Sequence, residues 1–103
     1  MPDAPIQLIN DAGGLPRVGL CTGVDLRPRQ LGQGDCRTVL LQVPLYMADG
    51  SANSADLFVG TAEAQPLRYS PGVSVTIPAN RLDDIYVANS ENTPLDIGYL
   101  FFL

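Results

Sequence analysis

The sequence contains no histidine, no lysine and no tryptophan. Without histidine, the arrangements in which an imidazole activates a serine or cysteine nucleophile are excluded, and a zinc site loses one of its usual ligands. All six basic residues are arginine, against eleven carboxylates, so the net charge is −5. Such an acidic chain has no basic face for phosphates, which argues against nucleic acid and anionic membranes as partners. The composition therefore favours a protein that is not an enzyme and holds no metal or other cofactor.

Charge is also scarce overall, because charged residues make up 17% of the chain and hydrophobic residues 46%. This balance favours a surface that meets another protein, although a tightly folded β-domain has the same composition. Arginine without lysine suits fixed contacts with carboxylates at interfaces, although a bias of the source genome explains it equally well. No apolar run approaches the ~18 residues of a transmembrane helix, and Met1 to Pro5 show no leader-like region. We therefore expect a soluble chain made in the cytoplasm.

Cys21 and Cys36 are the two cysteines of the chain. Two thiols without histidine are too few for a metal site, which needs about four ligands. A disulfide is sterically possible if the two strands pair, but a cytoplasmic origin disfavours it. Two small buried thiols are therefore the favoured interpretation, and a bridge is the alternative.

Proline and glycine make up 19 residues and punctuate the chain at regular intervals. The short runs between them are rich in valine, isoleucine, leucine and aromatic residues, and no window has a helical apolar period. Strands are predicted at 6–9, 18–26, 37–46, 56–59, 73–77, 84–88 and 95–103. This pattern predicts an all-β protein, a compact antiparallel β-sandwich or jelly-roll-like barrel with little or no helix. Residues 1–10 are expected to form an extended arm, and residues 11–103 a single β domain.

Two acidic clusters deserve a test as chemical sites. Asp83 and Asp84 form a carboxylate pair, but adjacent residues of a strand point to opposite faces, so the pair cannot converge on one substrate atom. A turn at the start of a strand is the favoured interpretation. The segment from Asp49 to Asn53 has part of the alternation of a calcium loop but lacks its final acidic residue, which favours a polar turn. We therefore predict no catalytic, cofactor-binding or metal-binding residue.

The two ends of the chain carry the strongest signals for assembly. The last strand places Leu95, Ile97, Tyr99, Phe101 and Leu103 on one face, yet Leu100 and Phe102 make its other face apolar as well. Such a strand lies between two layers of its own chain or in a subunit contact. The arm, with Ile6, Leu8 and Ile9, is expected to add a strand to a neighbouring subunit or to close its own sheet. The predicted interface residues are Ile6, Leu8, Ile9, Leu100, Phe101, Phe102 and Leu103.

Residues 36–103 contain a series of segments that form one pattern: CRTVLLQV from Cys36, LFVG from Leu57, the stretch from Leu67 to Pro78 with SPGVSVTIP, and LDDIYV from Leu82. This series resembles small structural proteins of tailed-bacteriophage virions. The resemblance implies a compact β-sandwich or jelly-roll module that decorates or cements the capsid, or that belongs to a tail or fibre. It transfers no catalytic residue to this chain.

The leading hypothesis is a non-enzymatic virion protein that decorates or cements the capsid surface after synthesis in the host cytoplasm. It is expected to act as a homo-oligomer, with a trimer favoured, and to bridge subunits of the major capsid protein. The alternative is a tail or fibre component that binds a host-surface glycan through tyrosines beside carboxylates. Tyr46, Tyr69, Tyr86 and Tyr99 are the tyrosines available, and the lack of tryptophan weakens this alternative.

Overall fold

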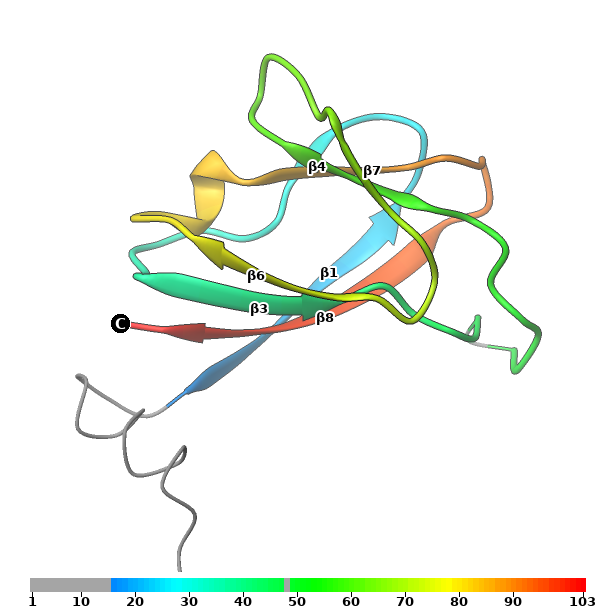
Figure 1. The fold of residues 1–103 in the computed structure, drawn as a ribbon, viewed down its shortest axis with the longest axis horizontal. Helices are drawn as coiled ribbons and strands as arrows, with labels where there is room; N and C mark the ends of the chain where they lie inside the picture. Colours follow the sequence, from blue (N-terminus) through cyan, green and yellow to red (C-terminus); the bar gives the residue numbers. More distant parts are fainter. Residues whose placement is uncertain (1–15, 48) are drawn as a thin grey trace, which may run out of the picture.

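A computed structural model describes residues 16–47 and 49–103 of the chain. These residues form eight strands and one short 3₁₀ helix, packed as two antiparallel sheets (Figure 1). The elements are β1 (Arg17–Val24), β2 (Arg29–Gln30), β3 (Thr38–Gln42), β4 (Leu57–Gly60), β5 (Leu67–Tyr69), β6 (Ser74–Pro78), η1 (Leu82–Asp84), β7 (Tyr86–Asn89) and β8 (Leu95–Phe102). The expected all-β sandwich is therefore confirmed.

The strand order is that of a long hairpin rolled into a sandwich. One sheet has the order β1-β8-β3-β6 and the other the order β2-β7-β4-β5. The pairs nest within one another, because β4 pairs with β5, β3 with β6, β2 with β7 and β1 with β8. This winding defines an eight-stranded jelly roll. It places the last strand beside the first described strand, in the middle of its sheet.

Most of the strands lie where the residue pattern predicts them, and two short ones were missed. β1, β3, β4, β6, β7 and β8 overlap the expected ranges within a few residues at each end, apart from the far end of β3. β3 ends at Gln42 because Pro44, which has no N–H to donate, follows closely. β2 and β5 have only two and three residues, too few to show an alternation. The strand expected at 6–9 and the arm of residues 1–10 lie outside the described residues.

Turn chemistry explains how β5 passes into β6. The N–H of Val73 donates to the carbonyl oxygen of Ser70 at 3.1 Å, and Gly72 has φ +87°. Proline at the second position and a left-handed glycine at the third are typical of a type II turn. Pro71 and Gly72 therefore form the turn that joins β5 to β6.

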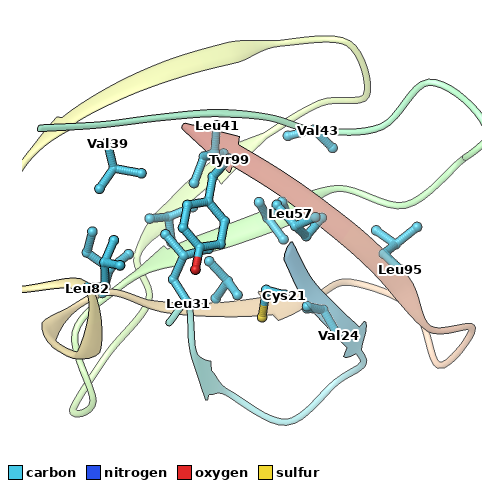
Figure 2. Close-up of a cluster of buried hydrophobic side chains, with 14 of the residues drawn as sticks. Cys21, Val24, Leu31, Val39, Leu41, Val43, Leu57, Leu82, Leu95 and Tyr99 are labelled. Atoms are coloured by element: carbon cyan, nitrogen blue, oxygen red, sulfur yellow. The ribbon is translucent and has the colours of Figure 1, made fainter. Parts of the chain in front are cut away.

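The core lies between the two sheets and is built from alternate residues of the strands. β3 contributes Val39 and Leu41, and β8 contributes Leu95 and Ile97, all at most 2% exposed. Burial of one such side chain stabilises the fold by roughly 1.5–3 kcal/mol. Figure 2 shows this cluster, with the ring of Tyr99 reaching across it toward Leu31.

Tyr99 depends on two glycines for its space in this core. A Cβ atom on Gly19 would overlap the ring and hydroxyl of Tyr99, and one on Gly32 would overlap the hydroxyl oxygen first. Gly19 lies opposite Tyr99 in the β1–β8 pair, while Gly32 lies in the loop after β2. The Tyr99 side chain therefore packs directly against the backbone of both glycines.

We predict that Gly19→Ala and Gly32→Ala each lower the free energy of unfolding by about 1–3 kcal/mol, the usual cost of overpacking. Tyr99→Phe removes the hydroxyl that the methyl group of Gly32→Ala would overlap. It keeps the ring carbons that the methyl group of Gly19→Ala would overlap. In urea unfolding, Tyr99→Phe should therefore rescue Gly32→Ala much more than Gly19→Ala. Equal rescue of both variants, or none of either, would contradict this packing.

Candidate interaction surface

The predicted carboxylate pair lies in η1, before β7 begins. Arg81 donates to Asp83 at 3.1 Å and also to Asp35 at 3.1 Å, and Arg81 is about half exposed. The hydrogen bond from Arg81 lowers the pKa of Asp83. A carboxyl that acts as a general acid near neutral pH needs a raised pKa. The contact with Arg81 lowers the pKa of Asp83 and so disfavours that role. Asp83 and Asp84 thus form the acidic turn that was expected.

The Asp49 segment also has a structural explanation. The Asp49 carboxylate accepts hydrogen bonds from the N–H of Ser51 at 2.9 Å and from its hydroxyl at 2.6 Å. This local turn is typical of aspartate in a loop. Within residues 16–47 and 49–103, no three or more acidic or thiol side chains gather as metal ligands.

The two cysteines are free and buried. The Sγ atom of Cys21 donates to the Gln30 carbonyl oxygen at 3.4 Å, and that of Cys36 donates to the Ala79 carbonyl oxygen at 3.2 Å. Burial raises the pKa of both thiols. They therefore behave as small core residues, as the favoured interpretation expected, and not as a bridge.

The predicted C-terminal interface residues divide between the two faces of β8. Phe101 points to the inner side, where its ring lies 6.0 Å from that of Tyr99, and it is half-buried against the core. Leu100 and Phe102 point to the opposite side and are also half-buried. Leu103, after the strand, is 41% exposed. Ile6, Leu8 and Ile9 lie outside the described residues.

Leu100 belongs to an apolar row that crosses the sheet. It is opposite Val18 of β1 on one side and Leu40 of β3 on the other. Val18 is 80% exposed, Leu20 62% and Leu40 36%, so none of the described segments covers them. We call the central part of this surface the outer face; its members are Val18, Leu20, Thr38, Leu40, Gln42, Ser74, Thr76, Gly98, Leu100 and Phe102. The outward residues Thr22, Pro78 and Asp96 flank it.

The outer face has a hollow at its centre. Its walls are Val18, Leu40, Gln42, Ser74 and Leu100, and Gly98 forms part of its floor. A Cβ atom on Gly98 would meet no other atom within 4 Å. The glycine therefore leaves space above the sheet that a side chain from outside can enter.

Val18 and Leu20 were not among the residues predicted for an interface. The signal that identified Leu100 and Phe102 was a strand apolar on both faces. β1 has the same signal, because Val18 and Leu20 alternate with Gly19 and the buried Cys21. The signal is weaker in β1, because Gly19 and Gly23 interrupt its apolar run.

Comparison of the chain with protein-family models, with characterised proteins and with solved structures yields no significant match. Among residues 16–47 and 49–103, no helix has the length and apolar character needed to cross a membrane.

We predict that both thiols react slowly with an aromatic disulfide reagent in the folded protein and rapidly in urea. In urea, the reagent should titrate two thiols per chain although no reductant has been added. The raised pKa values of the two thiols also predict a pH dependence of the free energy of unfolding. The contribution of the neutral buried thiols is fully present below the ordinary thiol pKa of about 8.5, and it is lost as the pH rises above that value. Urea unfolding from pH 7 to 10 measures this loss. Fewer than two thiols in urea would contradict the free pair.

Proposed function

We propose that this chain is a non-enzymatic structural protein of a tailed-bacteriophage virion, a decoration or cement protein on the capsid surface. The observation that carries the proposal is the group of exposed apolar side chains on the outer face, Val18, Leu20 and Leu40, which no described segment covers. Large exposed apolar surfaces on a folded domain are typical of sites that bind protein. Val18 and Leu20 project from this face, beside Leu100 of the last strand.

The fold agrees with this proposal without deciding it. Jelly rolls occur in viral capsid proteins and in lectins, and a fold alone does not determine a function. The resemblance of residues 36–103 to phage structural proteins supports the first class. The partner proposed is the major capsid protein, whose subunits a homo-oligomer of this chain bridges. Ile6, Leu8 and Ile9 of the arm, with Leu103 at the chain end, are the proposed contacts with the capsid.

We predict that purified protein binds saturably to heads assembled without it, and that bound heads retain their DNA to a higher temperature. Deletion of residues 1–10 should weaken binding at least ten-fold while the thermal melting of the domain stays unchanged, since the buried cluster found among the described residues lies within residues 21–99. Isolated tails serve as the control. Binding to tails alone, or to neither particle, would contradict the proposal.

Truncation at the chain end is a poor test of the same role. β8 pairs with β1 and β3 up to Phe102, and the carbonyl oxygen of Phe102 accepts from the N–H of Arg37 at 2.7 Å. Loss of the last four residues therefore removes part of the sheet as well as the surface. Substitution of single exposed residues separates the two effects.

The second candidate is glycan binding by a tail or fibre component. Two hollows favour it, because each places a tyrosine beside a carboxylate. One contains Tyr86 with Asp83 and Asp84, and the other contains Tyr46 with Asp96. Binding on a glycan array that Tyr86→Ala or Tyr46→Ala abolishes would favour this candidate over a cement protein.

A further inference from the structure

We propose that the outer face is where two copies of this chain pack against each other across a two-fold axis. The inference goes beyond the proposed function, because it concerns the free chain in solution and holds wherever the protein lies in a particle. It rests on the shape, the charge and the size of this face.

The shape of the outer face is self-complementary. Val18 and Leu20 project from β1 on one side of the hollow at Gly98, with exposed fractions of 80% and 62%. Leu20 lies opposite Gly98 in the sheet register. A two-fold axis between Leu20 and the hollow exchanges the two features, so that Leu20 of each copy enters the hollow of the other. An isologous contact requires this combination of projection and hollow on one surface.

The charge on the outer face also favours a second copy. The chain has a net charge of −5, so two copies repel each other over most orientations. The row from Val18 through Leu100 to Leu40 and Thr76 contains no charged residue. Asp96, the nearest outward carboxylate on β8, lies near the start of the strand and accepts a hydrogen bond from the N–H of Gly23 at 3.0 Å. The charge-free row therefore gives two acidic copies a surface on which they can meet.

The size of the face sets the strength of the contact. At ~3.3 Å per residue and ~4.8 Å between strands, the four strands cover roughly 400 Å² in projection. Two faces together bury about 800 Å², or more once the side chains interdigitate, which is less than the ~1,200 Å² of stable specific interfaces and is the size of weak, transient contacts. We therefore expect a weak, reversible dimer. This dimer takes the place of the trimer expected in the leading hypothesis: the outer face joins the two copies, and Ile6, Leu8, Ile9 and Leu103 remain the proposed capsid contacts.

Gly98→Val is the sharpest test of this contact. The backbone at Gly98 is not left-handed, and a Cβ atom there meets nothing in the monomer. Valine is also a better strand residue than glycine. The variant should fold with an unchanged or higher melting temperature, yet its side chain fills the hollow that Leu20 of the second copy needs.

Sedimentation velocity of the full chain over a wide concentration range measures the outcome. The wild type should move from monomer to dimer, and Gly98→Val and Leu20→Glu should each raise the dissociation constant at least ten-fold. Leu67→Glu is the matched control, because Leu67 is 53% exposed on β5, an edge strand of the other sheet. It should leave the dimer unchanged.

Several results would overturn the inference. A wild type that stays monomeric, or that forms a trimer, excludes the two-fold contact. A dimer that survives both Gly98→Val and Leu20→Glu uses another surface. A monomer that dimerises only after deletion of residues 1–15 shows that the chain's own N-terminal segment occupies the face. Failure of head binding, by contrast, would count against the proposed function and leave the dimer intact.

Discussion

The pairing of β8 with both β1 and β3 is the constraint on which the rest of this structure depends. The last strand of the chain lies in the middle of its sheet and contacts a strand near the start of the described chain on one side. This contact closes the jelly roll, since every other pair is nested inside it. Because β8 pairs with a strand near the opposite end of the described chain, the contact order is high, which is typical of β proteins that fold slowly.

The same strand serves two purposes through its alternation. Its inward residues, including Ile97 and Tyr99, fill the core, while outward Gly98 and Leu100 shape the outer face. Tyr99 in turn requires glycine at position 19 of β1. Gly19 of β1 thus makes space inside the sandwich, and Gly98 of the adjacent strand β8 leaves space outside it. The interaction surface is therefore coupled to the packing of the core.

The amino-acid pattern was sufficient for the fold class, because clear alternation in β3 and β8 and regular turns leave few other architectures. The pattern was insufficient to predict β2 and β5, because these strands are too short to show an alternation. They form by pairing with the edges of β7 and β4. The outer face was half predicted: Leu100 and Phe102 were identified, but Val18 and Leu20 were hidden by glycines. The hollow at Gly98 depends on which strands are neighbours, and sequence spacing does not specify that. The contribution of Ile6, Leu8 and Ile9 remains a prediction.

We propose that this small β domain works by attachment to a virion and not by catalysis. An electron cryomicroscopy reconstruction of the intact particle tests it most directly. The account predicts density for the jelly roll on the outside of the head, in contact with more than one subunit of the major capsid protein. Density at the tail or fibre alone, or a particle that contains no copy of the chain, would contradict it.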